Sequence, residues 1–511
     1  VTKNNGTLTM KLPLILFLLV LLVSCSSTNN SVSAYQQYNT YVELLKTQNY
    51  DDAIDLLTPY NQKRFKNKLT NETFEEFFPF FSSLDTVVVN QKQHFEVMEK
   101  SKSCLTVFGY DSEGEPTSLY FELLNHKIDS VINEAISLKA FPGAQILVIK
   151  DGNKIFNKNY GFHTYDSLIE VSENSIYDIA SLTKVTSSTL SLMKLYDNNL
   201  FFLEKPLSYY LKTFKKTDKG DILVKDFLLH KTGIRAWIPF YETTKNENGE
   251  FKKKTFRNKY SKRYSTYLTD SLYLYKKYKK EIYHQIKETY FVDTDSVLYS
   301  GLFFYLVPEI VSKLSKLSFE NFVGDIYSSL DLNKTLFNPL RKFPKNKIVP
   351  TENDDFFRMT QIHGVVHDEG AAMMDGVSGN AGLFSTANEL GVIYQTFLND
   401  GYYNGKKIFN SSTITLFTQC NYCSGKYHRG LGFDKPLLKY SIDDCTYSKY
   451  SSKKSYGHSG YTGTFVWVDP EYNLIYIFLS NRVYQTRDNG KLYEYNIRTK
   501  IHDYIYESFL K

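Results

Sequence analysis

The clearest hydrophobic pattern in the chain is a pair of apolar segments separated by a short polar turn, and it occurs twice. Residues 144–150 and 154–160 flank Asp151-Gly152, and residues 464–468 and 474–479 flank Asp469-Pro470-Glu471. An apolar run, a turn signal and a second apolar run are typical of a β-hairpin. We therefore predict two hairpins, one near each end of residues 125–511.

Helical spacing of apolar residues surrounds and separates these hairpins. Residues 128–138 precede the first hairpin, residues 491–509 follow the second, and most segments between them also have the period of a helix. Strands from both ends can form one antiparallel sheet flanked by the N- and C-terminal helices, with a helical subdomain inserted between them. Residues 125–511 are therefore predicted to have an α+β fold with a cleft between its two parts.

Residues 35–120 have a different pattern and predict a separate small α+β domain. Two helices are expected at residues 41–57 and 71–81, and strands at residues 86–89, 94–98 and 104–110. Helices followed by antiparallel strands resemble the nuclear-transport-factor-like folds. No catalytic pattern occurs in this segment, so we expect it to bind a partner or to act as a spacer.

An apolar run near the N-terminus, residues 12–23, ends shortly before Cys25. The run suits a signal-peptide core and is short for a membrane span, which needs about 20 residues. Its ending, Leu22-Val23-Ser24-Cys25, resembles a bacterial lipobox, in which the cysteine carries a diacylglycerol. We expect a leader over residues 1–25 with Met10 as the true start, a lipid anchor on Cys25 and a flexible tether over residues 26–34. The protein is thus predicted to be a lipoprotein of the bacterial cell envelope that faces the periplasm, in a membrane that the sequence does not identify.

Composition agrees with this organisation and adds one feature. A chain of 511 residues is too long for one ordinary core, and its 42% hydrophobic and 23% charged residues are typical of globular domains. The net charge of +6 is concentrated, because residues 245–280 hold twelve Lys or Arg and three Asp or Glu, a local +9 (12 − 3). This basic, aromatic insertion at residues 241–290 is expected to be solvated and partly helical, with contact to an anionic envelope polymer as the alternative. The leader argues against a nucleic-acid partner.

Four cysteines besides Cys25 remain: Cys104, Cys420, Cys423 and Cys445. Cys420 and Cys423 have the spacing of a CxxC pair, but one pair and a distant third cysteine are a weak metal signal. In an oxidising compartment we expect a loop disulfide instead, with Cys445 as a candidate partner. No metal ion and no organic cofactor is implied.

The strongest chemical signal lies in residues 177–186. Ser181 and Lys184 are three residues apart and therefore share one face of a helix. A lysine in so apolar and hydroxyl-rich a segment is disfavoured as a cation, and a neutral amine beside a hydroxyl can take its proton. A helix N-terminus at Ser181 adds a partial positive charge and a free backbone N–H for an oxyanion. An isolated SxxK pattern is common, however, and an ordinary helix N-cap is the alternative.

Two further motifs strengthen this signal. Tyr299-Ser300 immediately precedes an apolar helix at residues 302–314, and His458-Ser459-Gly460 opens a strand that continues to residue 468. A Ser/Lys pair, a tyrosine and a strand with a basic residue, a hydroxyl and glycine, in this order, are the three elements of the serine β-lactamase and penicillin-binding fold. Residues 125–511 resemble the class C-type β-lactamase-related serine hydrolases. They are especially similar to the β-lactamase-like domain that some Bacteroidetes proteins carry fused to a β-N-acetylhexosaminidase. Five more matching stretches are residues 228–234, 363–369, 376–386, 429–436 and 479–484.

The resemblance implies a role for each matching residue. Ser181 would attack the acyl carbon and Lys184 would receive its proton, while Tyr299 would protonate the leaving group and then activate the deacylating water. His458, where many relatives have the lysine of a KTG triad, would supply a pH-dependent positive or hydrogen-bonding group. The backbone N–H groups of Ser181 and Tyr461 would form the oxyanion hole.

Substrate contacts are expected from Ser459, Gly460 and Asn380. Gly460 would leave room for the substrate along the strand edge, and Asn380 would line the cleft or merely turn the chain. His230 and His367 are expected to hold loops.

The chain departs from the family pattern at Gly301, where relatives usually have Asn or Asp. In relatives that process β-lactams and peptides, that side chain bonds the substrate amide and braces the lysine. Phe303 follows where a small residue is expected, which predicts a narrower and more apolar pocket. Both changes weaken the case for efficient β-lactam hydrolysis.

We therefore expect a lipid-anchored serine hydrolase that acts through an acyl-enzyme on an ester, a D-amino-acid peptide or a β-lactam-like amide. The partner would be a small molecule or a cell-wall peptide, and the resemblance does not choose between them. The alternative is a catalytically weak, penicillin-binding-like sensor or cell-wall-binding lipoprotein. The sequence leaves the oligomeric state open.

Overall fold

The computed structural model describes residues 84–89, 95–99, 105–108 and 119–510, apart from 294–296, 421, 424–427 and 443–444. The chain divides into two compact units, with the boundary in the sequence between His126 and Lys127.

In the first unit the described residues form a three-stranded antiparallel sheet. Its order is β1-β2-β3, with β1 at Leu84–Val89, β2 at Phe95–Glu99 and β3 at Leu105–Phe108. The three strands lie where the alternating pattern predicts them. The helices expected at residues 41–57 and 71–81, the leader with Cys25, and Cys104 lie outside the described residues. The lipid anchor and the type of small domain therefore stay predictions.

The second unit is built on a five-stranded antiparallel sheet formed by both ends of its chain. The order is β16-β17-β18-β4-β5, with β4 at Gly143–Lys150, β5 at Asn153–Gly161, β16 at Tyr456–Gly460, β17 at Thr464–Asp469 and β18 at Leu474–Ser480. Both predicted hairpins are confirmed, and β4 of the first pairs with β18 of the second. Strands β17 and β18 are buried along their whole length, as expected of strands covered on both faces.

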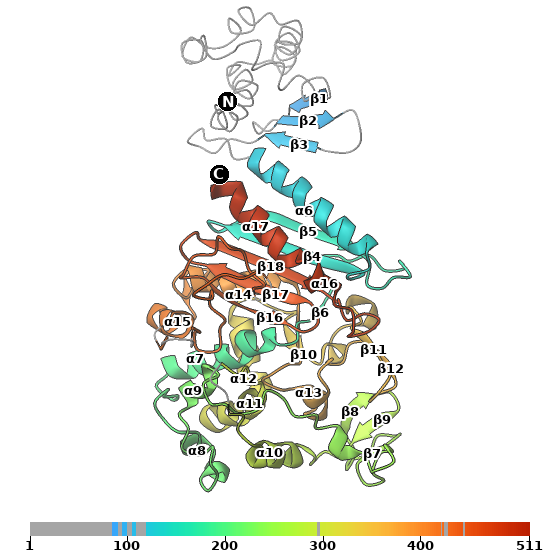
Figure 1. Cartoon of the computed structure of the whole chain (residues 1–511), viewed down its shortest axis with the longest axis vertical. Helices are drawn as coiled ribbons and strands as arrows, with labels where there is room; N and C mark the ends of the chain where they lie inside the picture. Colours follow the sequence, from blue (N-terminus) through green and yellow to red (C-terminus); the bar gives the residue numbers. More distant parts are fainter. Residues whose placement is uncertain are drawn as a thin grey trace, which may run out of the picture. The chain divides into compact units, whose positions relative to one another are not determined.

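Helices cover the two faces of this sheet (Figure 1). On one face lie α6 (Leu119–Ser137) and α17 (Ile497–Leu510), where the Arg498 guanidinium donates to the Thr464 carbonyl. On the other face α14 (Ala387–Leu398) packs so closely that a Cβ on Gly391 would lie 2.7 Å from Leu147 Cδ2. The helix predicted at residues 491–509 is interrupted: α16 (Lys491–Glu494) ends before Asn496, which has a left-handed φ of 50°.

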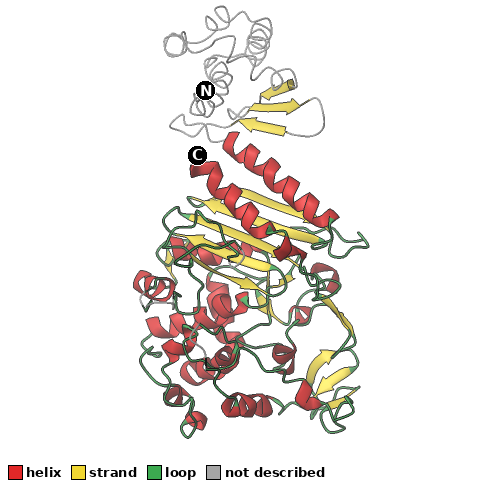
Figure 2. Cartoon of the chain, in the orientation of Figure 1, coloured by secondary structure: helices red, strands yellow, loops and turns green. Residues whose placement is uncertain are grey.

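The chain between the hairpins is mainly helical, so the predicted α+β class is confirmed (Figure 2). Its further helices are α7 (Leu190–Asp197), α8 (Leu207–Tyr210), α9 (Val224–Leu228), α10 (Lys279–Glu288), α11 (Leu302–Ser315), α12 (Phe319–Ser329), α13 (Glu369–Met373) and α15 (Ser411–Thr418). Helix α11 is buried nearly all round and lies in the middle of the apolar core. No helix among the described residues is long and apolar enough to cross a membrane.

A small sheet joins this helical part to the site described below. Its order is β10-β13-β6, with β6 at Tyr177–Asp178, β10 at Leu336–Phe337 and β13 at Leu383–Ser385. Two-stranded sheets are formed by β11 (Glu352–Asp354) with β12 (Thr360–Ile362), and by β14 (Tyr402–Tyr403) with β15 (Lys406–Lys407).

The basic insertion at residues 241–290 is partly helical, as predicted, because it contains α10. It also forms a three-stranded sheet that the sequence reasoning missed, with β7 (Phe256–Arg257), β9 (Leu272–Leu274) and β8 (Thr266–Thr269) in that order. Its aromatic residues have a packing role, since Tyr264 is buried and the Arg257 guanidinium stacks 4.5 Å from its ring.

The expected loop disulfide joins Cys420 to Cys423, whereas Cys445 is a buried free thiol, so the suggestion that Cys445 takes part is wrong. The two sulfurs and a ring nitrogen of His428 lie within 4.8 Å of one another. Sulfurs in a disulfide are not thiolate ligands, so this cluster does not hold a metal while the bond is intact.

Candidate active site

Ser181 lies in the turn that joins strand β6 to a helix. The Asp178 carboxylate accepts the Ala180 N–H at 2.8 Å, which supports a left-handed φ of 46° at Ala180. Helical structure begins at Leu182, passes through a π-helical turn at Lys184–Thr189 and continues as α7. Ser181 therefore stands at a helix N-terminus, as the sequence predicts.

The structure brings Ser181 and Lys184 into direct contact. Lys184 is only 3% exposed, and its Nζ lies 2.8 Å from Ser181 Oγ. The same Nζ donates to the Asn380 carbonyl oxygen at 3.0 Å. Among the described residues no carboxylate lies within ion-pair distance of this amine. The amine is thus aimed at the hydroxyl rather than at a counter-ion.

Tyr299 lies beside this pair and is 38% exposed. Lys184 Nζ lies 5.3 Å from the centre of the Tyr299 ring, and the His230 ring lies 4.7 Å from it on centroids. His230 Nδ1 also accepts the Ser300 N–H at 3.1 Å. His230 therefore holds the loop that presents Tyr299 to the site.

His458 stands next to Tyr299 in the edge strand β16, with the two ring centroids 5.8 Å apart. Burial lowers the pKa of His458 to about 4; Lys184 and Arg429 act in the same direction and Asp434 opposes them. The ring is therefore neutral at physiological pH, so of the two expected roles, a positive group or a hydrogen-bonding group, the structure leaves the second. Its Nδ1 donates to the Ser459 carbonyl at 2.7 Å, because a carbonyl can only accept. Nε2 is then an acceptor, and it is buried without a partner among the described residues.

Arg429 completes the positively charged surroundings of Tyr299, and the sequence reasoning gave it no role. Its guanidinium carbon lies 6.0 Å from the centre of the Tyr299 ring, and it forms an ion pair with Asp434 at 2.5 Å. Burial is the largest single influence and raises the pKa of Asp434, but Arg429, together with His458 and Lys184, holds that pKa below its usual value. The sequence feature that could have indicated this role is the position of Arg429 in the matching stretch at residues 429–436.

Two backbone N–H groups, those of Ser181 and Tyr461, have no hydrogen-bond partner among the described residues. The Tyr461 side chain is 48% exposed, and its ring contacts the Arg482 guanidinium at 4.6 Å and the His367 ring at 5.7 Å. Free, fixed N–H groups are what an oxyanion hole requires.

The structure corrects three expected roles. Asn380 is 5% exposed, and its side chain bonds to Ser378 and Asp368, so it holds Lys184 through its carbonyl and does not line the cleft. A Cβ on Gly460 would lie 2.1 Å from Thr464 Oγ1, so this glycine makes room for the chain itself rather than for substrate. Phe303 stacks on Phe227 in the core at 5.0 Å, so it does not narrow the pocket. Ser459, by contrast, stays partly exposed in β16, where a substrate can reach it.

Gly301 leaves open space directly beside the amine. A Cβ at this position would lie 3.8 Å from Lys184 Cε, an ordinary contact, and the φ of −81° suits any residue. Nothing in the local packing therefore requires glycine here.

Comparison with known proteins identifies relatives of the part of the chain that holds this site. The family model described as "Beta-lactamase" matches residues 128–499. The chain is 30% identical over 401 residues to "N-acetylmuramyl-L-alanine amidase" of Bacillus subtilis, covering 72% of this chain and 84% of that protein. It is 29% identical over 393 residues, with the same two coverages, to the Salmonella gallinarum protein named "Putative D-alanyl-D-alanine carboxypeptidase".

Solved structures match the fold at low sequence identity. "EstCE1, a hydrolase with promiscuous acyltransferase activity" matches with a TM-score of 0.55 at 14% identity, covering 75% of this chain and all of that chain. "A class C beta-lactamase" also matches with a TM-score of 0.55 at 14% identity, covering 79% of this chain and 99% of that chain.

Replacing Lys184 by Met, which keeps the length and removes the amine, is expected to lower kcat/KM for an activated ester by about 10³-fold. The matched control is Lys194→Met in the same helix, because Lys194 Nζ bonds to the Ile408 carbonyl and is outside the site. The control should keep its activity within about threefold in steady-state assays. Equal losses in the two variants would show that the effect of Lys184 is structural.

Proposed function

Since the chain belongs to the beta-lactamase family and is a serine hydrolase of that family, we propose that it cleaves a D-amino-acid peptide or a small ester through an acyl-enzyme on Ser181. The observation that carries this proposal is the 2.8 Å contact between Lys184 Nζ and Ser181 Oγ in a buried environment. The free N–H groups of Ser181 and Tyr461 support it, because they lie on the two segments that flank the nucleophile.

In the acylation step, Ser181 Oγ attacks the acyl carbon while its proton passes to the Lys184 amine. The negative charge that develops on the acyl oxygen is stabilised by the Ser181 and Tyr461 N–H groups. The leaving group takes a proton as its bond to the acyl carbon breaks, and Tyr299 stands where it can deliver one. The result is an ester on Ser181 and a free amine or alcohol.

In the deacylation step, a water molecule attacks the ester and gives up its proton to Tyr299, and the Lys184 ammonium returns its proton to Ser181 Oγ as the bond from this oxygen to the acyl carbon breaks. Tyr299 can accept this proton because it has given its own to the leaving group in the acylation step. Breakdown of the intermediate restores the Ser181 hydroxyl and releases the acid.

The substrate class is proposed from two observations. Two matched relatives are named as an N-acetylmuramyl-L-alanine amidase and a putative D-alanyl-D-alanine carboxypeptidase. The resemblance in sequence also implies that Gly301 removes the side chain that bonds the substrate amide in β-lactam- and peptide-processing relatives. The names of the relatives favour a D-amino-acid peptide, and the missing amide contact favours a small ester; neither observation favours a β-lactam antibiotic.

We also propose that the enzyme is attached to the cell envelope by lipid on Cys25 and works on the periplasmic side. This rests on the lipobox-like ending of the N-terminal apolar run.

A second candidate function is favoured by one observation, the glycine at position 301. If the missing side chain slows deacylation, the protein would be acylated without turnover and would act as a sensor of cell-wall fragments. Turnover measurements separate this candidate from the hydrolase.

Incubation with a fluorophosphonate probe or a fluorescent penicillin is expected to add one label to Ser181, located by peptide mass spectrometry. Ser181→Ala should take no label, and purified enzyme should turn over at least one substrate in a panel of esters and D-Ala-D-Ala peptides. Absence of a Ser181 adduct with every probe would refute the proposal, and a stable adduct without turnover would favour the sensor.

Replacing Gly301 by Asn is expected to raise the acylation rate with a fluorescent penicillin about 2- to 12-fold. That range corresponds to one neutral hydrogen bond of roughly 0.5–1.5 kcal/mol to the substrate amide. The control is Gly301→Ala, which fills the space beside Lys184 Cε without a hydrogen-bonding group. The same rate in both variants would contradict this account of Gly301.

A further inference from the structure

The reaction scheme above gives no part to Asp178, although this carboxylate is buried three residues before Ser181. It is 1% exposed, and within the described residues no Lys or Arg side chain lies in ion-pair distance of it. Its Oδ1 accepts the Ala180 N–H at 2.8 Å and its Oδ2 accepts the His367 N–H at 2.7 Å. A buried carboxylate supported only by backbone donors is costly, so its presence needs a reason.

The carboxylate fixes the backbone of the nucleophile turn. Ala180 has a left-handed φ of 46°, a conformation that the Cβ of an alanine disfavours. The bond from its N–H to Oδ1 holds this conformation and thereby sets the direction of the next N–H, which belongs to Ser181.

The backbone of the same residue fixes the other oxyanion donor. The Asp178 carbonyl accepts the Thr462 hydroxyl at 2.7 Å, and the Ile179 carbonyl accepts the Thr464 hydroxyl at 3.0 Å. These two bonds fasten the turn that carries Tyr461 onto the segment that leads to Ser181.

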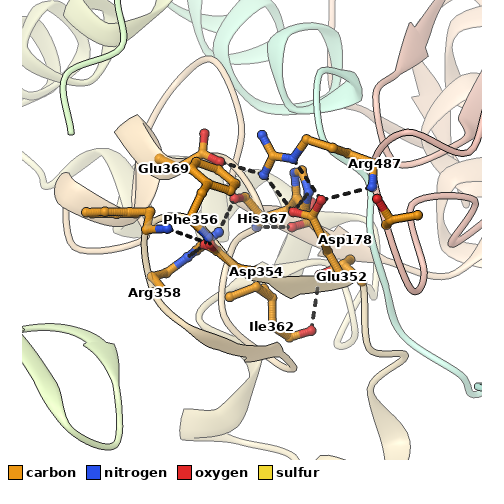
Figure 3. A network of polar contacts seen from close by, with 12 residues as sticks. Asp178, Glu352, Asp354, Phe356, Arg358, Ile362, His367, Glu369 and Arg487 are labelled. Carbon is orange, nitrogen blue, oxygen red and sulfur yellow. Dashed lines mark hydrogen bonds and ion pairs between the residues drawn. The ribbon is translucent and has the colours of Figure 1, made fainter. Parts of the chain in front are cut away.

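The second carboxylate oxygen reaches a third segment, shown in Figure 3. His367, whose N–H it accepts, donates from Nε2 to the Glu352 carboxylate at 2.8 Å, and Arg487 donates to both Glu352 and Glu369. The His367 ring lies 5.7 Å from the Tyr461 ring. This network of charged side chains therefore reaches the Ser181 side of the oxyanion hole through the bond from the His367 N–H to the Asp178 carboxylate. It reaches the Tyr461 side through the contact between the His367 and Tyr461 rings.

We propose that Asp178 is a positioning residue for the reaction, which sets the distance and direction of the Ser181 and Tyr461 N–H groups relative to each other. This inference rests on the proposed function, since it concerns the same oxyanion hole. Asp178 does not touch the substrate; it acts through Ala180, Thr462 and His367. Its effect should therefore be felt in the transition state, where the acyl oxygen is negative, and hardly in substrate binding.

The test is Asp178→Asn in the full chain, which keeps the shape but replaces one acceptor oxygen by an NH₂ donor that cannot accept a backbone N–H. We expect kcat for an ester to fall about 10- to 100-fold while KM changes less than about threefold. The affinity for a boronic acid that mimics the tetrahedral intermediate should fall by the same factor as kcat/KM.

The matched control is Asp469→Asn. Asp469 is equally buried, lies at the far end of β17 and bonds to Ser452 and Tyr506 instead of to the site. This variant should lose thermal stability and keep kcat within about threefold. If Asp178→Asn does not fold, Thr462→Val cuts the bond to the Asp178 carbonyl and leaves the carboxylate in place. This variant tests the part of the proposal that concerns the Tyr461 N–H, and the same split between kcat and KM is expected.

Labelling of Ser181 in the wild-type protein, measured in the same series, distinguishes a failure of the positioning role from a failure of the proposed function. If the wild type is labelled and Asp178→Asn, or Thr462→Val in its place, keeps both kcat and boronic-acid affinity within threefold, only the positioning role is overturned. Equal loss of kcat in Asp469→Asn would also overturn it. If the wild type is not labelled, the proposed function fails and the positioning role fails with it.

Discussion

An amine that is to take a proton from a hydroxyl has to be kept out of water and within hydrogen-bond reach of that hydroxyl. In this protein the amine is that of Lys184, and its Nζ lies within hydrogen-bond distance of both Ser181 Oγ and the Asn380 carbonyl. Aromatic rings close the space around it, with Tyr299 and Phe304 at 5.3 and 5.8 Å from Nζ to the ring centres. The buried helix α11, the loop that carries Asn380 and the turn before Ser181 must all be in place for this contact to exist.

The rest of the architecture serves to bring three distant segments to that amine. Ser181 follows strand β6, and Tyr299 lies just before α11. His458 lies in the edge strand β16, and Tyr461 lies in the turn after this strand. The five-stranded sheet joins the two ends of the domain, since β4 pairs with β18, and this fixes β16 relative to the helical part. Buried hydroxyls on Thr462 and Thr464 then tie the strand end to the nucleophile segment.

Much of this could be predicted from the sequence, because it depends on local signals. Turn residues between apolar runs located both hairpins, and the three-residue spacing of Ser181 and Lys184 placed the two side chains together.

The errors, and the choice between two roles that the sequence left open for His458, concern properties that depend on contacts between distant segments. The charge of His458 is decided by its burial, the role of Asn380 by a backbone carbonyl, and the need for Gly460 by a neighbouring strand. Phe303 faces the core because α11 is buried nearly all round, which its sequence alone does not reveal. Asp178 lies within the segment that carries the strongest chemical signal, but two of its three connections reach residues 189 and 284 positions away.

The central claim is that Ser181 is the nucleophile and that its own N–H and that of Tyr461 receive the negative charge. A crystal structure of the protein after reaction with a slowly released acylating agent tests both parts at once. The account predicts an ester bond to Ser181 Oγ, with the acyl oxygen about 2.7–3.1 Å from the backbone nitrogens of Ser181 and Tyr461. An acyl group on another residue, or an acyl oxygen that points away from both nitrogens, would contradict it.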